Sequence, residues 1–315
     1  MNTKNNKTVL YVVGPTASGK TGLSISLAKE LSATVICGDS MQIYKDMPIA
    51  TAAPTAEEKQ DVPHLMFEFL SPTETFSVSQ YVDMAKKSIS SLHSDGILPM
   101  VVGGTGLYIS SLSENIIFGE EEDDGSFRKM LLEKSNSIGL DVLYDELKKI
   151  DPDSAAKISE NDEKRIIRSL EVYYLTGETM TERIIKSRTE GEIYNNIFIG
   201  VSYKDRQKLY ERINKRVDLM VESGLVSEAE KYFGQDYKTS SQAIGHKELF
   251  PYFEGKASLE ECIEHLKMQT RRYAKRQLTW FNRNKNINWI YMDEEQDPLN
   301  RVLEIVKTNK ALERG

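Results

Sequence analysis

The first third of the chain alternates short apolar runs with segments in which apolar residues recur at helical spacing. Apolar runs occupy residues 8–13, 33–37 and 98–102, and helical periodicity covers 21–31 and 78–93. Short buried strands that alternate with helices are typical of βαβ units, whose strands run parallel in one sheet. The pattern therefore predicts an α/β fold with a doubly wound parallel sheet.

The middle of the chain has a different pattern. Residues 119–125 read Gly-Glu-Glu-Glu-Asp-Asp-Gly, which we interpret as a solvated linker. Helical periodicity follows over 128–147 and 163–175, and an apolar run over 196–201 returns the chain to the sheet. We expect an α/β core and a helical insertion domain, with the core formed by residues 1–118 and 197–315 and the insertion by residues 119–196.

Two long amphipathic helices are predicted after residue 202. The first has an apolar stripe that begins at Leu209, while Arg212 and Arg216 lie one turn apart on another face. The second carries basic residues at four-residue spacing, and no acidic residue occurs from 265 to 292. Because a solvated helix usually interleaves glutamates, this stretch indicates a polyanionic partner. Its basic residues are Lys267, Arg271, Arg272, Lys275 and Arg276.

A phosphate-binding loop (P-loop) lies between the first strand and the first helix. A glycine-rich turn lets backbone N–H groups converge on an oxyanion, and the helix adds its positive end. Lys20 supplies a mobile cation and Thr21 a hydroxyl for Mg²⁺. An ordinary turn would not place a lysine where the helix dipole repels it. The loop consists of Gly14, Pro15, Thr16, Ala17, Ser18, Gly19, Lys20 and Thr21.

Ligands of doubly wound sheets bind at the carboxyl ends of the strands, so residues 14–21, 38–44 and 103–108 should face one cleft. Nucleotide hydrolases and kinases usually carry a carboxylate at the end of a later strand. Here the run 98–102 is followed by glycines and Thr105, and the acid is Asp39 instead. Such an acid can accept a proton or hold a metal-bound water, and spacing leaves both roles open.

Composition limits the remaining possibilities. A formal net charge of −7 over 315 residues argues against a surface that binds nucleic acid throughout, but permits a local basic face. Cys37 and Cys262 form no Cys-x-x-Cys pair or histidine cluster, so we predict buried, reduced thiols. The N-terminus is polar, and no apolar run reaches membrane-spanning length. We therefore expect a cytoplasmic protein without a membrane segment.

Six motifs occur in a fixed order along the chain. They are the P-loop, Asp39-Ser40-Met41-Gln42-Ile43-Tyr44, Pro63-His64, Val102-Gly103-Gly104-Thr105-Gly106-Leu107-Tyr108, Arg212-Ile213-Asn214-Lys215-Arg216-Val217-Asp218 and Arg271-Arg272-Tyr273-Ala274-Lys275-Arg276-Gln277-Leu278-Thr279-Trp280. Taken together, these motifs resemble those of the bacterial tRNA dimethylallyltransferases, the IPP transferase family. The resemblance extends from the first strand to about Trp289.

The resemblance implies a prenyltransferase that uses dimethylallyl diphosphate and Mg²⁺. The acceptor would be the exocyclic amine of the adenosine on the 3′ side of the anticodon, in tRNAs that read codons starting with U. Asp39 would take the proton of the amine, and Thr105 would contact the tRNA beside it. Lys20 and Arg216 would stabilise the leaving diphosphate, and Thr21 would hold the Mg²⁺.

The implied partner is the tRNA anticodon stem-loop, from which a monomeric enzyme would extrude the target base. Gln42 is similar to the family residue that reads the adenine edge, since an amide offers one donor and one acceptor. Beyond the five basic residues of the second long helix, the residues expected to contact tRNA are Asp39, Ser40, Met41, Gln42, Thr105, Arg128, Lys164, Arg165, Ile166, Ile167, Arg168, Gln242, Ala243, Ile244, Gly245, His246 and Lys247.

The sequence departs from the family pattern at three positions. Ala53 stands where a lysine is common, His246 where a tyrosine is frequent, and Leu65 follows His64 where a second histidine is often found. None of the three touches the implied chemistry. Their expected effect is on phosphate contacts and on stacking in the loop around His246.

Three other functions remain open on the residues alone. An adenylate prenyltransferase that acts on free nucleotide would not need the helical insertion or the basic helix. A phosphoryl-transfer enzyme such as a small-molecule kinase is disfavoured because no acid follows Val102. A non-catalytic RNA-binding module would leave the P-loop and Asp39 unexplained. The P-loop suits ATP as well as a diphosphate.

Overall fold

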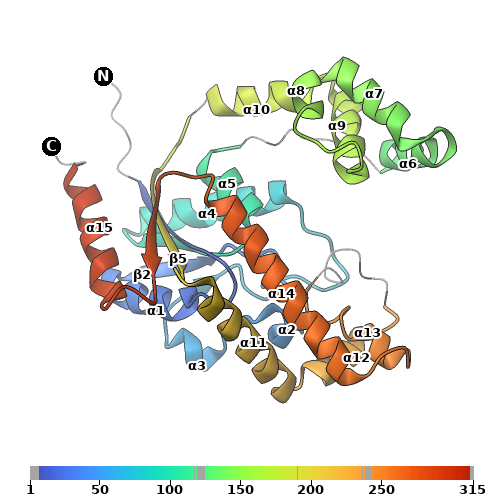
Figure 1. Cartoon of the computed structure of the whole chain (residues 1–315). Coiled ribbons are helices and arrows are strands. Elements are labelled where there is room, and N and C mark those ends of the chain that lie inside the picture. Colours follow the sequence, from blue (N-terminus) through green and yellow to red (C-terminus); the bar gives the residue numbers. More distant parts are fainter. Residues whose placement is uncertain are drawn as a thin grey trace. The chain divides into compact units, whose positions relative to one another are not determined.

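The computed structural model describes residues 7–116, 118, 125–189, 191–235, 237 and 243–312 (Figure 1). It divides into two compact units. Unit 1 comprises Met1–Ser113 and Ile193–Gly315, and unit 2 comprises Glu114–Glu192. Unit 2 is thus inserted into the sequence of unit 1. Gln242 and most of the acidic segment 119–125 lie outside the described residues.

Unit 1 contains a six-stranded parallel sheet with strand order β3-β2-β4-β1-β5-β6. The chain fills one side of β1 first and then crosses to the other, which makes β1 the topological switch point. The predicted doubly wound α/β fold is confirmed. The strands are β1 (Thr8–Val13), β2 (Ala33–Cys37), β3 (His64–Leu65), β4 (Leu98–Gly103), β5 (Asn195–Ser202) and β6 (Ile287–Tyr291).

Helices cover both faces of the sheet because its central strands are apolar on both sides. Every residue of β1 is buried, as is usual for an inner parallel strand. Leu10 and Val12 face α1 and α15, whereas Tyr11 lies on the side of α4 and α5. The helices of unit 1 are α1 (Lys20–Leu31), α2 (Pro48–Thr51), α3 (Ala56–Lys59), α4 (Val78–Ser94), α5 (Gly106–Ser113), α11 (Arg206–Glu222), α12 (Leu225–Tyr232), α13 (Phe250–Phe253), α14 (Leu259–Phe281) and α15 (Pro298–Leu312).

The carboxyl ends of three strands lie level with one another. Val13 of β1 pairs with Gly103 of β4, and Cys37 of β2 pairs with Val102. A Cβ atom on Gly103 would lie 2.1 Å from the backbone of Gly38, so only glycine permits this approach. The loops that follow β1, β2 and β4 are therefore brought to one edge of the sheet.

Unit 2 consists of helices around its own core. Leu131, Leu147, Ile166 and Leu170 are fully buried and pack together. The single periodic segment expected over 128–147 is two helices, since Gly139 interrupts it with a φ of 100°. The helices are α6 (Ser126–Ile138), α7 (Leu140–Ile150), α8 (Pro152–Ala155), α9 (Glu163–Thr176) and α10 (Met180–Thr189).

Most of the regular elements expected from the sequence are present, within a few residues at their ends. Strand β6 and helix α15 were not predicted. Only Ile287 and Ile290 of β6 are buried, so this edge strand lacks a continuous apolar run. Cys37 and Cys262 are buried and unpaired, as predicted. Among the described residues, no helix is long and apolar enough to cross a membrane.

Candidate active site

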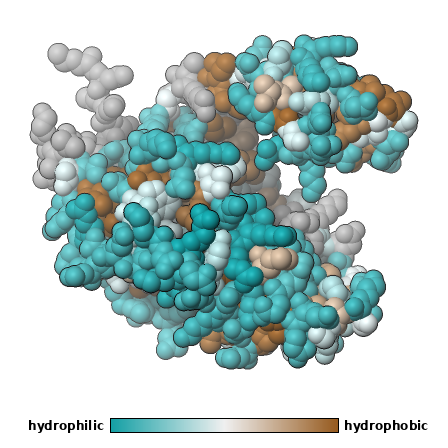
Figure 2. Space-filling view, in the orientation of Figure 1, coloured by the Kyte–Doolittle hydropathy of each residue, from teal (hydrophilic) through white to brown (hydrophobic). Residues whose placement is uncertain are grey.

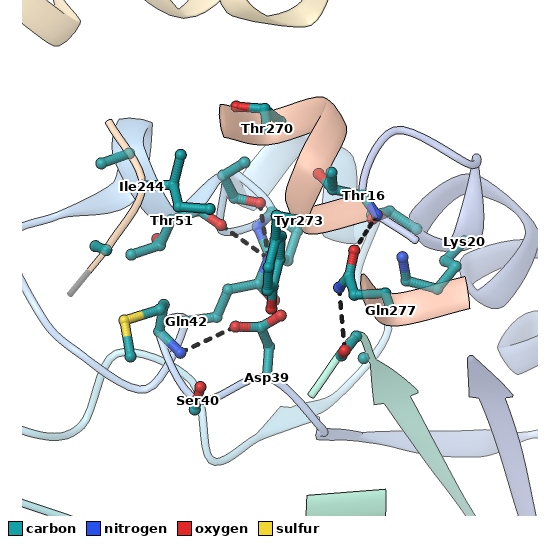
Figure 3. A pocket seen from close by; sticks show the side chains of 18 of the residues that line it. Thr16, Lys20, Asp39, Ser40, Gln42, Thr51, Ile244, Thr270, Tyr273 and Gln277 are labelled. Carbon is teal, nitrogen blue, oxygen red and sulfur yellow. Dashed lines mark hydrogen bonds between the residues drawn. The ribbon is translucent and has the colours of Figure 1, made fainter. Parts of the chain in front are cut away.

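A cleft of about 410 Å³ lies in unit 1 at the carboxyl edge of the sheet. The loops after β1, β2 and β4 all contribute to its walls, which confirms that they face one site. Helices α11 and α14 complete it. Figure 3 shows Thr270, Tyr273 and Gln277 on α14. The polar and charged residues that line the cleft are Thr16, Lys20, Thr21, Ser24, Asp39, Ser40, Gln42, Thr51, His64, Arg216, Lys247, Thr270, Tyr273, Arg276 and Gln277.

The P-loop has the backbone conformation that its glycines predict. Gly14 has a φ of 148°, and a Cβ atom there would lie 2.2 Å from the carbonyl oxygen of Val201. Gly19 has a φ of 96°, directly before α1 begins at Lys20. Ala17 also has a positive φ, of 61°, which L residues other than glycine adopt at a cost. The turn therefore carries the positive end of α1 toward the cleft.

Lys20 lies in the floor of the cleft without an acidic hydrogen-bond partner in the described part of the chain. Its Nζ donates to the carbonyl oxygen of Pro15 at 2.7 Å. Burial lowers the pKa of this lysine to about 7, and repulsion from Arg216 acts in the same direction, although Asp39 opposes the shift. Binding of an anion would supply the counter-charge that this site lacks.

Two arginines of α11 contact the P-loop. Arg212 Nε donates to the carbonyl oxygen of Ala17 at 3.1 Å, and Arg216 Nη1 donates to Thr16 Oγ1 at 3.3 Å. Burial lowers the pKa of Arg216, although Glu58 and Asp39 counteract this effect. Apolar packing of Leu209 and Ile213 fixes α11 in this position. Arg216 is therefore part of the cleft and not a solvated surface charge.

The loops that carry Asp39 and Thr105 meet at the ends of β2 and β4. Asp39 Oδ1 accepts from the N–H of Met41 at 2.9 Å, which orients the carboxylate. Thr105 Oγ1 accepts from the N–H of Ser40 at 2.9 Å and contacts Ser40 Oγ at 3.2 Å. The threonine hydroxyl thus joins the two loops.

Tyr273 of α14 was not singled out from the sequence, yet it lies beside this pair. Burial and the Asp39 carboxylate raise the pKa of Tyr273, while a hydrogen bond with Thr105 partly offsets the rise. Figure 3 shows its ring next to the Asp39 carboxylate. The motif around Arg271 contained the signal, since Tyr273 lies one turn before Gln277 on the same helix face.

The side chain of Gln42 is hydrogen-bonded to the C-terminal end of the neighbouring helix α2. Its Nε2 donates to the carbonyl oxygens of Thr51, at 3.2 Å, and Ala52, at 2.9 Å. Only its Oε1 is left to meet a ligand. The expected reading of adenine by one donor and one acceptor of this amide is therefore not available in this conformation.

Glu228 of α12 accepts hydrogen bonds from the backbone of helix α2. The carboxylate accepts from the N–H groups of Ile49, at 3.0 Å, and Ala50, at 2.9 Å, and His246 Nε2 lies 2.8 Å from it. Burial works against the charged carboxylate, but these hydrogen bonds lower the pKa of Glu228 overall. His246 also stacks on Tyr232 with ring centroids 4.7 Å apart. The side chain of His246 is buried, so the predicted contact of this side chain with tRNA is wrong.

The other residues of the 243–247 segment divide between core and cleft. Ala243 is buried, whereas Ile244 and Lys247 line the cleft and Lys247 is exposed. Gly245 has a φ of 136°, and a Cβ atom there would lie 3.1 Å from that of Ala50. This glycine therefore permits the loop to pack on α2.

The basic helix is α14, and its exposed face is hydrophilic (Figure 2). Arg272, Lys275 and Arg276 are exposed. Lys267 differs, because its Nζ lies 2.8 Å from Asp218 and 2.9 Å from Glu264. The expectation that this helix has no acidic partners is therefore wrong at its first basic residue. Arg271 donates to Asn214 Oδ1 at 2.6 Å and holds α11 against α14.

In unit 2, most of the residues predicted to contact tRNA are ion-paired or buried. Arg128 and Arg168 both lie 2.7 Å from Glu171, which is buried. Arg165 pairs with Asp162 at 3.3 Å, whereas Lys164 is exposed. Ile166 and Ile167 belong to the core, so their side chains cannot contact RNA. That part of the expectation is corrected, because the apolar face of α9 points inward.

The parallel sheet with a phosphate-binding loop at its switch point defines a P-loop α/β protein. A family model described as IPP transferase matches residues 42–284 of this chain. A tRNA dimethylallyltransferase of Acetivibrio thermocellus is 47% identical over 289 residues, which cover 91% of this chain and 92% of that protein. The chain therefore belongs to the IPP transferase family.

Solved structures are similar over nearly the whole chain. The full-length tRNA isopentenylpyrophosphate transferase from Bacillus halodurans has a TM-score of 0.72 at 42% identity, covering 98% of this chain and 100% of that one. A eukaryotic dimethylallyltransferase, described as acting on tRNA, has a TM-score of 0.81 at 31% identity. That match covers 98% of this chain and 80% of the other.

The lowered pKa of Lys20 predicts a pH-dependent affinity for diphosphate. Above pH 7 the free lysine is mostly neutral, and a bound anion raises its pKa, so binding takes up a proton. The affinity for inorganic pyrophosphate should therefore fall as pH rises from 7 to 9, by up to about ten-fold per unit. Calorimetry in buffers of different ionisation enthalpy measures this uptake.

Lys20→Arg is the matched control, since arginine keeps its proton throughout this range. The variant removes the proton uptake that comes from the lysine, but it leaves the proton exchange of pyrophosphate itself. Equal proton uptake by the wild type and the variant would contradict the assignment.

Proposed function

We propose that this chain transfers the dimethylallyl group of dimethylallyl diphosphate to the exocyclic amine of the adenosine on the 3′ side of a tRNA anticodon. The observation that carries the proposal is that the P-loop and Asp39 share one cleft bordered by α14. A phosphate cradle, a proton acceptor and an exposed basic helix are what this reaction needs. Membership of the family supports the same conclusion.

In the proposed reaction, the amine nitrogen attacks the first carbon of the dimethylallyl group. A C–N bond forms as the C–O bond to diphosphate breaks, and the leaving group takes the bonding electrons. Asp39 accepts the proton that the amine loses, with its carboxylate oriented by the N–H of Met41. Thr105 holds the Ser40 loop in place beside it.

The leaving diphosphate needs positive charge where it departs. Lys20 and Arg216 line the cleft on the P-loop side, and the N-terminus of α1 points to the same place. Their mutual repulsion in the free protein means that both gain when an anion lies between them. Each such preorganised contact commonly lowers the activation free energy by about 3–4 kcal/mol.

Mg²⁺ is the cofactor that family resemblance implies. Within the described ranges, no group of three or more His, Cys, Asp or Glu side chains could hold a metal ion. The donors fit instead an ion that arrives with the diphosphate, because Thr21 presents a hydroxyl at the start of α1 and lines the cleft. When bound there, Mg²⁺ would neutralise charge on the leaving group.

Binding of tRNA would use the exposed residues of α14, namely Arg272, Lys275 and Arg276, with Lys247 at the border of the cleft. The extruded adenine would enter the cleft beside Asp39, where its amine can reach the carboxylate. We further propose that the enzyme acts as a cytoplasmic monomer, as its resemblance to the bacterial tRNA dimethylallyltransferases implies.

The deciding experiment incubates the purified protein with Mg²⁺ and radiolabelled dimethylallyl diphosphate, and offers unmodified tRNA or AMP as acceptor. We expect label in tRNA and none in AMP. Transfer to AMP would identify an adenylate prenyltransferase. Turnover of ATP without prenyl transfer would identify a phosphoryl-transfer enzyme and overturn the proposal.

Asp39→Asn tests the proton acceptor. The amide preserves the shape and the contact with Met41 but cannot take the proton, so kcat should fall by about 10²–10⁴-fold. Pyrophosphate affinity should change little. Asp46→Asn, on the same segment but outside the cleft lining, is the matched control and should retain activity. A defect of Asp39→Asn that excess Mg²⁺ rescues would favour the metal-water role instead.

Lys275→Ala and Lys267→Ala form a matched pair for tRNA binding. Lys275 is exposed, whereas Lys267 is neutralised by Asp218 and Glu264. Removal of Lys275 should weaken tRNA binding and reduce the salt dependence of its affinity by about one phosphate contact. Removal of Lys267 should leave that slope nearly unchanged. The slopes come from filter binding between low and physiological salt, and equal effects would refute the distinction.

A further inference from the structure

Gln277 connects two loops of the cleft that are far apart in sequence. Its Oε1 accepts from the N–H of Thr16 at 2.9 Å, and its Nε2 donates to the carbonyl oxygen of Gly104 at 3.0 Å (Figure 3). The side chain belongs to α14 and is only 5% exposed. The single amide therefore bridges the P-loop after β1 and the glycine loop after β4.

Gly104 and Gln277 fit one another closely. A Cβ atom on Gly104 would lie 2.1 Å from Nε2 of Gln277, so a larger residue would displace the amide. The backbone of Gly104 does not have a positive φ. The glycine is thus explained by the space that the amide occupies, and not by its own conformation.

Thr16 is held at two points. Gln277 binds its backbone N–H, and Arg216 binds its hydroxyl. The first contact comes from α14 and the second from α11, the two helices that close the cleft over the P-loop. Because the neighbouring Ala17 has a positive φ, this part of the loop needs external contacts to stay in place.

We propose that Gln277 is a positioning residue that fixes Thr16 relative to Gly104 and so preorganises the P-loop for diphosphate. Both hydrogen-bonding groups of its amide are engaged with the protein, so Gln277 acts through the loop and not on the reacting atoms. The proposal rests on the proposed function only for the identity of the diphosphate that the loop receives.

Gln277→Met is the principal test, because methionine keeps the length of the side chain and removes the hydrogen bonds with Thr16 and Gly104, together with the one that the amide makes with the Tyr273 side chain. The dissociation constant for inorganic pyrophosphate, measured by calorimetry, should rise about ten-fold. The KM for dimethylallyl diphosphate should rise to the same extent, while kcat at saturation changes less than three-fold. Thr279→Ala is the control on the same helix, since within the described ranges that hydroxyl bonds only to the carbonyl oxygen of Lys275.

Gly104→Ala tests the same contact from the other side and leaves Gln277 chemically intact. The added methyl group should displace the amide, so pyrophosphate affinity should fall as in Gln277→Met. Combining the two substitutions should have little further effect, because each removes the same bridge. This second route also applies if Gln277→Met does not fold.

The outcomes separate this inference from the proposed function. Unchanged pyrophosphate affinity in folded Gln277→Met, or in folded Gly104→Ala, overturns the positioning role even if tRNA is prenylated. A variant with lower kcat and an unaltered dissociation constant and KM also overturns it, because that result indicates a structural role alone. Weakened pyrophosphate binding in both variants supports the role even if no acceptor is prenylated.

Discussion

The active cleft depends on close contact between backbones at the carboxyl edge of the sheet. Gly103 lies against Gly38, Gly14 against Val201, and Gly104 leaves room for an amide from α14. Any side chain at these positions would separate the loops. The ends of these strands are level, so close approach of the loops brings the P-loop near the loops that carry Asp39 and Thr105. Glycine at positions 14, 103 and 104 is therefore a precondition for assembling the site.

Local sequence signals were sufficient for the four inner strands of the sheet, β2, β4, β1 and β5, and for the residues that stand directly after β1, β2 and β4. The P-loop, Asp39 and Thr105 follow buried strands whose carboxyl ends must meet at one edge. Partnerships between distant segments were not visible in this way. The pairing of Lys267 with Asp218, the bridge made by Gln277 and the burial of His246 depend on the packing of helices, which periodicity alone does not specify.

Helix α14 has a different task on each side. Its inner side places Tyr273 beside Asp39 and Gln277 beside the P-loop, whereas its outer side exposes Arg272 and Lys275. From the sequence, the basic residues of this helix were predicted to form an exposed surface that contacts tRNA. In the structure the same helix also forms a wall of the cleft, which is why apolar and polar residues with structural roles lie between the arginines.

The contact between Glu228 and His246 bears on how variation within the family is interpreted. Glu228 supports α2 at its amino end, and the carbonyl oxygens at the other end of α2 hold Gln42 and Arg216. The side chain at position 246 therefore meets Glu228 and Tyr232 of α12 in the protein interior. Histidine at this position thus serves the packing between neighbouring helices, and it gives no reason to infer a different substrate.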